Sequence, residues 1–273
     1  MQKNIDSICS LASAVAHILG IEPPSLAVSP VPAPVLRETY EVLNGRAAER
    51  CLIFAPDAIG KHLASVCENE FSAIRRICKV EIPVQSVMPS KTPVCFASMF
   101  SGAKPEKHGI RQYEKPVLQC DTLFDTLIRS GRIPAIVAVR ESSMDLIFRG
   151  REMGYYSEGL DSDTTNRTKE LMLEDRCDVI VCYQQEYDDI LHRTQPFSEE
   201  ALSAVKRHVS SFRELALSAR EAWRGKSYAL VFAPDHGAHT DPNTGNGTHG
   251  DDIPEDMELF HWYKINSSHT APE

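Results

Sequence analysis

The stretch YALVFAPDHG, residues 228–237, joins an apolar strand to a polar turn. Its first six residues form an apolar run of strand length with Val and aromatic side chains, which predicts a buried strand. Pro234 ends that strand because it has no N–H group to donate to a neighbouring strand. Asp235 and His236 follow at once. Since Asp and Gly are ordinary turn residues, this stretch alone also fits a turn without function.

Similar apolar runs recur along the chain, and helical patterns separate them. We expect strands within residues 51–55, 80–88, 133–139, 178–183 and 228–233. We expect helices around residues 60–78, 93–100, 122–131, 164–175 and 197–223, the last with Ser198 as its N-cap. This alternation predicts an α/β fold, with a mostly parallel sheet sandwiched between helices.

We divide the chain into two parts. Residues 1–35 are expected to form an N-terminal helix and a Pro-rich connector packed on the core. Residues 36–273 are expected to form a single α/β domain, with residues 140–165 as a candidate lid over one end of the sheet.

Composition excludes several classes of protein. The net charge of −9 argues against stable binding to nucleic acid or to anionic membranes, so an anionic substrate must be attracted locally. No run of 18 apolar residues is present. Asp6 lies at the start of the N-terminal apolar stretch and no A-x-A-like site ends it, so we do not expect a signal peptide. The eight cysteines form no C-x-x-C pair, so we expect a reduced, cytoplasmic location.

Reactive side chains follow several of the expected strands. They are Asp57, Thr92, Asp188, His192, Asp235 and His236. In open α/β sheets the carboxyl ends of the strands are where ligands bind, so these side chains are expected to converge. Unpaired carboxylates gathered there would repel one another, and divalent cations are the simple remedy. Mixed Asp and His ligands suit Zn²⁺ or a similar transition metal such as Mn²⁺ or Fe.

Several motifs, in this order along the chain, resemble the alkaline phosphatase superfamily and most of all its nucleotide pyrophosphatase/phosphodiesterase branch. They are MPSKTPVCFASMFSGAKPEKHGI (88–110), YDDILHRTQP (187–196), APDHG (233–237) and GTHG (247–250). The resemblance runs from about residue 50 to residue 265. It implies a metal-dependent phosphoester hydrolase with a binuclear metal site.

The resemblance also implies a role for each residue. One metal ion would be held by Asp188, His192 and His249. The other would be held by Asp57, Asp235, His236 and the hydroxyl group of Thr92. Thr92 would attack phosphorus to form a covalent phosphothreonine intermediate, which is then hydrolysed. Asp189 stays open as an alternative ligand to Asp188, and His239 as an alternative to His249.

Two departures from that branch bear most on substrate binding. Cys95 stands three residues after the nucleophile, where an Asn that contacts a phosphate oxygen is expected; a backbone N–H, Lys91 or Lys61 could replace that contact. Only 12 residues separate His236 from His249, so we expect little or no cap domain and a site that is open or covered by residues 140–165.

We therefore predict a hydrolase of the phosphodiesterase or nucleotide pyrophosphatase type that acts on a small anionic phosphoester. A phosphomonoesterase or a phosphonate (C–P) hydrolase would use the same core. A metal- and phosphate-binding protein with weak catalysis is the alternative of another class, suggested by Cys95. Formation of a homo-oligomer stays open.

Overall fold

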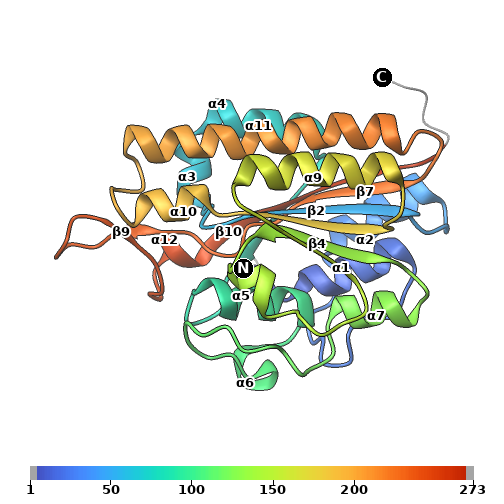
Figure 1. Ribbon diagram of the computed structural model, residues 1–273, viewed down its shortest axis with the longest axis horizontal. Coiled ribbons are helices and arrows are strands. Elements are labelled where there is room, and N and C mark those ends of the chain that lie inside the picture. The colour runs from blue at the N-terminus through green and yellow to red at the C-terminus, as the bar shows by residue number, and fades with distance from the viewer. Residues whose placement is uncertain (1–4, 269–273) are drawn as a thin grey trace.

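The computed structural model describes residues 5–268 and is built around an eight-stranded sheet (Figure 1). In spatial order, the strands are β1 (Asp6–Ser7), β3 (Val80–Gln85), β10 (Glu258–Asn266), β7 (Tyr228–Phe232), β2 (Arg50–Pro56), β6 (Val179–Gln184), β4 (Pro134–Val139) and β5 (Gly154–Glu158). A separate two-stranded ribbon pairs β8 (His239–Thr240) with β9 (Gly247–Thr248).

Strand direction decides where the chain can build a site. Strand β10 runs antiparallel to both of its neighbours, β3 and β7, and all other pairs in the large sheet are parallel. Seven strands therefore point the same way. Their carboxyl ends lie along one edge of the sheet, and the loops and helices that follow them meet there.

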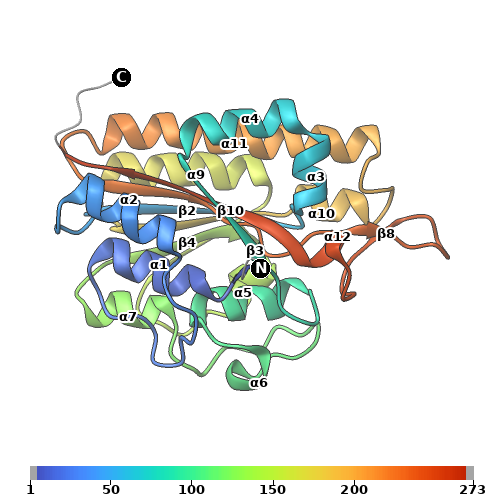
Figure 2. The same ribbon diagram turned by 180° about the vertical axis from the view of Figure 1, so that it is seen from behind.

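Helices cover both faces of this sheet (Figures 1 and 2). One layer consists of α1 (Ser10–Leu19), α2 (Ala33–Leu43), α5 (Thr92–Ser101), α7 (Leu123–Arg129) and α8 (Ser143–Leu146). The other consists of α3 (Lys61–Val66), α4 (Glu68–Ile77), α9 (Asp161–Glu174), α10 (Glu186–Leu191) and α11 (Glu199–Ala222). The short helices α6 (Pro105–His108) and α12 (Pro254–Met257) lie in loops.

The central strands are apolar on both faces because helices cover both. In β2, Ile53 and Ala55 belong to the apolar core under α1 and α5, whereas Leu52 and Phe54 belong to the core under α4 and α11. Side chains alternate along a strand in this way. Continuous apolar runs such as residues 51–55 are therefore typical of a buried parallel sheet, and the predicted α/β sandwich is confirmed.

The N-terminal segment is more closely tied to the sheet than the sequence suggests. The expected helix is α1, which is buried along nearly its whole length. The two-residue strand β1, which was not expected, adds an edge to the sheet beside β3. Helix α2 begins at Ala33, inside the segment expected to be a Pro-rich connector. The division at residue 35 itself stays a prediction.

Residues 140–165, the candidate lid, belong mostly to the sheet and its helical layers, and a role as a lid stays a prediction. They provide α8, the edge strand β5 and the first turns of α9. Strand β5 pairs with β4 from Gly154 to Glu158, so most of this range is part of the sheet and its helical layer. Only its first residues, 140–143, line the pocket described below.

Within residues 5–268, no helix combines the length and apolar character needed to cross a bilayer.

Candidate metal centre

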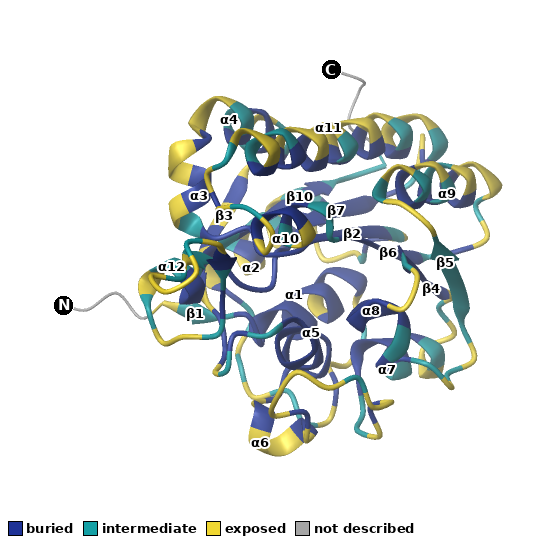
Figure 3. Cartoon of the chain, turned by 60° about the vertical axis from the view of Figure 1, so that its left-hand side comes forward, coloured by how far each residue is buried: buried dark blue, intermediate teal, exposed yellow. Residues whose placement is uncertain are grey.

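Two clusters of Asp and His side chains lie at the carboxyl edge of the sheet. Figure 3 looks towards this edge, with α5, α8 and α10 in the foreground. Asp57 follows β2, Asp235 and His236 follow β7, and Asp188 lies on α10 just after β6. His192 directly follows α10, and His249 follows the ribbon strand β9. The edge thus gathers residues that are up to 192 positions apart in the chain (249 − 57).

The first cluster consists of Asp57, Asp235 and His236, and all three are almost completely buried. Nε2 of His236 lies 3.4 Å from Oδ1 of Asp57 and 3.3 Å from Oδ2 of Asp235. Oγ1 of Thr92 lies 3.3 Å from the same Nε2 atom. The hydroxyl group predicted as a metal ligand therefore faces this cluster.

The second cluster consists of Asp188, His192 and His249. Oδ1 of Asp188 lies 3.4 Å from Nε2 of His192 and 3.5 Å from Nε2 of His249. The two Nε2 atoms are 3.2 Å apart. The clusters adjoin, because the rings of His236 and His249 stack with their centroids 4.0 Å apart.

These spacings match the geometry of a metal site. Zinc ligands stand about 2.0–2.1 Å from the ion, so two ligands of a tetrahedral site are about 3.3 Å from each other. Every distance between ligand atoms quoted for the two clusters lies between 3.2 and 3.5 Å. Each cluster therefore has the size of a single first coordination shell.

The protonation of the imidazoles supports the same interpretation. Nδ1 of each ring faces a backbone carbonyl oxygen: Gly247 for His192, Gly237 for His236 and Ser90 for His249. A carbonyl oxygen only accepts, so each Nδ1 must donate and each neutral ring turns an unprotonated Nε2 towards its cluster. In the second cluster two Nε2 lone pairs and a carboxylate oxygen then face one another. A shared cation removes that repulsion, and such carbonyl contacts are typical of ligand histidines.

The carboxylates also have unused oxygen atoms. Oδ1 of Asp57, Oδ1 of Asp188 and Oδ2 of Asp235 are buried and have no hydrogen-bond partner. A buried carboxylate oxygen without a partner is costly unless a cation coordinates it. The residues present therefore fit two divalent cations, one in each cluster.

Buried charge shifts the pKa values of these acids. Burial, with the nearby carboxylates of Asp235 and Asp188, raises the pKa of Asp57 well above its usual value. Burial also raises the pKa of Asp235 to about 6. For Asp188, burial acts in the same direction, but the neighbouring imidazoles of His192, His249 and His236 hold the pKa below its usual value. The first cluster is thus the one with the greater excess of negative charge.

Asp256 holds the loops that carry the histidines. Its side chain is fully buried, and Oδ2 accepts hydrogen bonds from the backbone N–H groups of Gly250 and Asp251, at 2.8 and 2.9 Å. Its Oδ1 accepts from Nδ1 of His239 at 2.8 Å. Its carbonyl oxygen accepts from the N–H of Gly237 at 2.8 Å. Asp256 therefore ties the residue after His236 to the residue after His249.

Three further side chains, Lys91, Cys95 and Lys61, were candidates for substrate binding from the sequence. Lys91 is adjacent to Thr92, and its ammonium group donates to the carbonyl oxygen of His249. Lys61 pairs with Glu258 at 2.6 Å and does not line the pocket. Cys95 is fully buried in α5, with Sγ 3.3 Å from Oγ of Ser86, and it does not line the pocket.

The alternative ligands lie outside both clusters. His239 bonds to Asp256 and lies 3.4 Å from Asp251. Asp189 accepts a hydrogen bond from Gln185 at 3.1 Å and lines the pocket. Neither residue belongs to a candidate ligand group.

One pocket opens onto both clusters, with a cavity volume of about 100 Å³. Its lining includes Asp57, Thr92 and Asp188, together with residues 140–143, Tyr113 and Lys115. Sequence reasoning did not identify Tyr113, Lys115, Tyr183 or Asp256. Tyr113 and Lys115 follow the KHGI motif by a few residues, and that proximity was the only available signal.

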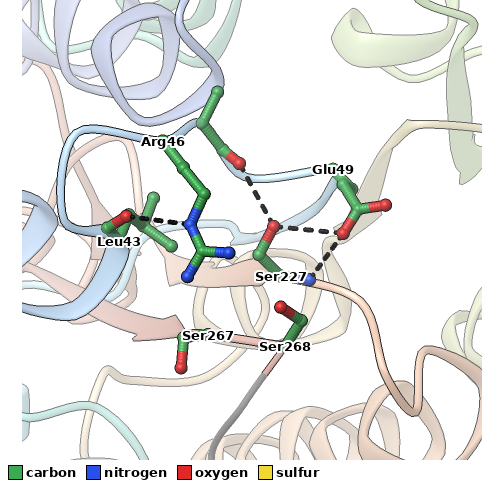
Figure 4. Close-up of a pocket in the computed structure, with 7 residues that line it drawn as sticks. Leu43, Arg46, Glu49, Ser227, Ser267 and Ser268 are labelled. Carbon is green, nitrogen blue, oxygen red and sulfur yellow. Dashed lines mark hydrogen bonds between the residues drawn. The ribbon is translucent and has the colours of Figure 1, made fainter.

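A larger hollow of about 180 Å³ lies at the opposite edge of the sheet (Figure 4). Its carboxylate, Glu49, accepts hydrogen bonds from the backbone N–H and the hydroxyl of Ser227, at 2.9 and 3.2 Å. Among its lining residues within the described chain there is no His, Cys or second carboxylate. It does not offer the chemistry found at the carboxyl edge.

Comparison with solved structures agrees with the resemblance seen in the motifs. Murine ectonucleotide pyrophosphatase/phosphodiesterase 5 matches with a TM-score of 0.55 and 19% sequence identity, over 70% of this chain and 58% of the murine chain. Phosphonoacetate hydrolase from Sinorhizobium meliloti, solved in complex with phosphonoacetate, matches with a TM-score of 0.51 and 17% identity, over 71% of this chain and 59% of its own.

This chain has their fold. The structural neighbours thus include members of the branch that the motifs resemble. The matched region spans less than two thirds of the length of these neighbours. No protein-family profile matches the sequence, and no curated protein is similar to it at a significant level.

Proposed function

We propose that this chain is a two-metal phosphoester hydrolase in which Thr92 is the nucleophile. The observation that carries the proposal is the position of the Thr92 hydroxyl group. It lies 3.3 Å from Nε2 of His236, inside the first ligand cluster, and it also lines the pocket. A nucleophile must be reachable by substrate and close to the group that activates it, and this hydroxyl satisfies both conditions.

Local structure prepares Thr92 for this role. Thr92 is the first residue of α5, a helix of ten residues, and Pro93 follows it. The N-terminal end of a helix carries partial positive charge, which stabilises negative charge on an oxygen placed there. The side chain is nearly buried, so it is held in position. The helix terminus favours the ionised form of the hydroxyl group, and burial restricts its orientation.

Each cluster would bind one metal ion. Asp188, His192 and His249 would hold one ion, and Asp57, Asp235, His236 and Thr92 the other. Bound divalent ions supply charge stabilisation for the attacking and leaving oxygens of an in-line displacement. Thr92 would attack phosphorus, the leaving group would depart on the opposite side, and water would later cleave the phosphothreonine. Tyr183 and Asp256 would keep the ligand residues in place.

We propose zinc as the ion, since three imidazoles and three carboxylates form the two ligand sets, and Mn²⁺ or Fe remains the alternative. The proposed substrate is a small molecule that contains a phosphodiester or pyrophosphate bond. A phosphonate is the second candidate, because one structural neighbour was solved with phosphonoacetate and the cavity is small. The cytoplasmic location and the oligomeric state stay predictions.

The test is hydrolysis of bis-p-nitrophenyl phosphate by the native protein, with and without added zinc. Thr92→Ala should lower kcat by about 10³-fold or more, whereas Thr92→Ser should keep part of it, because serine retains a hydroxyl group. Thr240→Ala, at an exposed position, is the matched control and should keep the native rate. Bound zinc without any turnover would favour the metal-binding alternative, and full activity in Thr92→Ala would exclude Thr92 as the nucleophile.

A further inference from the structure

The lining of the pocket also contains cationic side chains. Lys115 and Arg140, which we call the basic rim, are the only cationic side chains among the described residues that line it. The same lining contains three acidic residues that follow the strands: Asp57, Asp188 and Asp189. Glu141, next to Arg140, is a further carboxylate on the lining. The pocket therefore places two cations beside a phosphoryl site in a chain whose net charge is −9.

The basic rim is not used for ion pairs within the protein. Nζ of Lys115 donates to the carbonyl oxygen of Glu141 at 2.8 Å, and Arg140 donates to the carbonyl oxygen of Ser157 at 3.1 Å. No carboxylate within residues 5–268 forms a salt bridge with either cation. Each bond to a carbonyl oxygen orients its cation without neutralising it. Both side chains therefore keep charge and N–H donors for a ligand.

The backbone beneath the rim is held in place. The N–H of Arg140 donates to the carbonyl oxygen of Glu158, and the N–H of Glu141 donates to Oδ2 of Asp145, a buried side chain. Glu141 has φ of +62°, a left-handed conformation that is unfavourable for a residue with a side chain. The contact with Asp145 stabilises it. This turn aims residues 140–143 at the pocket instead of continuing the direction of β4.

We propose that Lys115 and Arg140 bind a second anionic group on the substrate, a carboxylate or a phosphate, beside the phosphoryl group at the metal centre. This inference rests on the proposed function. Two metal ions would offset the three clustered Asp side chains and one negative charge of a phosphoryl group. Asp189 and Glu141 also line the pocket, but within residues 5–268 neither forms a salt bridge with Lys115 or Arg140, so both cations are available to a second anion. Thr92 and the basic rim line the same cavity of about 100 Å³, so a second anion bound at the rim would lie close to the phosphoryl group.

The expected substrates are small molecules with two anionic groups separated by a few bonds. It also explains how a chain of net charge −9 attracts such a molecule. The basic rim provides local attraction that the overall charge does not.

The experiment measures binding, so it does not depend on turnover. Ethylphosphonate, 2-carboxyethylphosphonate and ethylene-1,2-diphosphonate are titrated calorimetrically into the zinc-supplemented protein. The first has one anionic group, and the others add a carboxylate or a second phosphonate at similar length. We expect at least one two-anion ligand to bind about tenfold more tightly than ethylphosphonate, equivalent to about 1.4 kcal/mol. The tighter of the two identifies the second group.

Variants assign that difference to the basic rim. In the double variant Lys115→Gln/Arg140→Gln the preference should fall below twofold, while the affinity for ethylphosphonate stays within twofold of native. Arg224→Gln is the matched control, because Arg224 is exposed and precedes β7 at the opposite edge of the sheet. It should keep the native preference.

Equal binding of all three ligands to the native protein would overturn the inference, as would a preference that survives in the double variant or no binding at all. Failure of the proposed function is recognised separately. Bis-p-nitrophenyl phosphate would then not be hydrolysed, although the binding preference could still be present.

Discussion

The hydroxyl group of Tyr183 donates a hydrogen bond to Oδ2 of Asp57, between the neighbouring strands β6 and β2. This contact fixes the carboxylate, and its other oxygen, Oδ1, faces Nε2 of His236 at 3.4 Å without a hydrogen-bond partner. Tyr183 is almost completely buried, so water cannot replace its hydroxyl group easily. The tyrosine thus orients one oxygen of Asp57 towards the position proposed for a metal ion.

Tyr183→Phe should weaken zinc binding. Loss of a partner that orients a metal ligand typically lowers metal affinity 10- to 100-fold, and we expect a change of that order here. Competition with a chromophoric chelator measures it. Tyr263→Phe is the matched control, because the buried hydroxyl group of Tyr263 has no hydrogen-bond partner in the described chain. Equal zinc affinity in Tyr183→Phe and native protein would show that the contact does not orient Asp57.

Asp235→Asn should stabilise the metal-free protein at neutral pH. Burial raises the pKa of Asp235 to about 6, from an ordinary value of 3.8. As pH rises from 3.8 to about 6, the Asp235 carboxyl group loses its proton in the unfolded chain before it does so in the folded protein. The metal-free native state therefore loses about 3 kcal/mol of stability by pH 7. The Asn side chain of the variant does not ionise, so the variant lacks this loss of stability. Its amide keeps an oxygen that can accept from the N–H of Ala58.

Thermal unfolding at pH 4.5 and pH 7.5, with chelator or with zinc, measures this effect. The metal-free variant should unfold at a higher temperature than metal-free native protein at pH 7.5, and zinc should stabilise the variant less. Asp252→Asn, at an exposed position, should change neither result. A metal-free variant less stable than native protein at pH 7.5 would argue against buried charge repulsion at the first cluster.

His261 should make the fold sensitive to acid. Burial lowers the pKa of His261 to about 4, from an ordinary value of 6.5, and its Nε2 donates to the carbonyl oxygen of Pro234 at 2.9 Å. The stability tied to the neutral ring is present above pH 6.5 and is lost as pH falls towards 4, by about 3 kcal/mol. His261→Gln keeps a donor but does not titrate. Urea unfolding at pH 7.5 and 4.5 should therefore show a smaller acid loss in the variant, and identical losses would contradict the assignment.

Gly237→Ala should damage both stability and metal binding. A Cβ atom at this position would lie 2.0 Å from the carbonyl oxygen of Glu255, so the backbone beside His236 must move. Overpacking of this kind typically costs about 1–3 kcal/mol. Gly159→Ala is the matched control, because its added Cβ would meet its nearest neighbour at 3.7 Å. Denaturant unfolding measures the stability, and a zinc titration measures the metal affinity. A variant with the native stability and the native zinc affinity would show that the loop can shift to accept the added methyl group.

The sequence allowed prediction of the central strands but not of the sheet's margins. Strands β2, β4, β6 and β7 are covered by helices on both faces, so they appear as continuous apolar runs. Strand β10 (ELFHWYKIN) mixes Glu, His and Lys with apolar residues, which hides it, and its antiparallel direction has no local signature. Strand β1 has two residues and exists only because β3 is beside it. Whether such strands form depends on tertiary contacts and not on local sequence.

The ligand clusters could be anticipated because each member follows a strand or belongs to a recognisable motif. Their supporting residues could not. Tyr183 faces Asp57 only because β6 pairs with β2, and Asp256 reaches both histidine loops only after α12 folds back. The placement of Cys95 was also beyond the sequence, because its contact with Ser86 depends on how α5 packs against the end of β3.

The most direct test of the account is a crystal structure of the zinc-soaked protein with anomalous data collected at the zinc absorption edge. We predict two peaks, one among Asp188, His192 and His249 and the other among Asp57, Asp235 and His236. Peaks elsewhere on the chain, or none at either cluster in zinc-saturated crystals, would contradict the proposed metal centre.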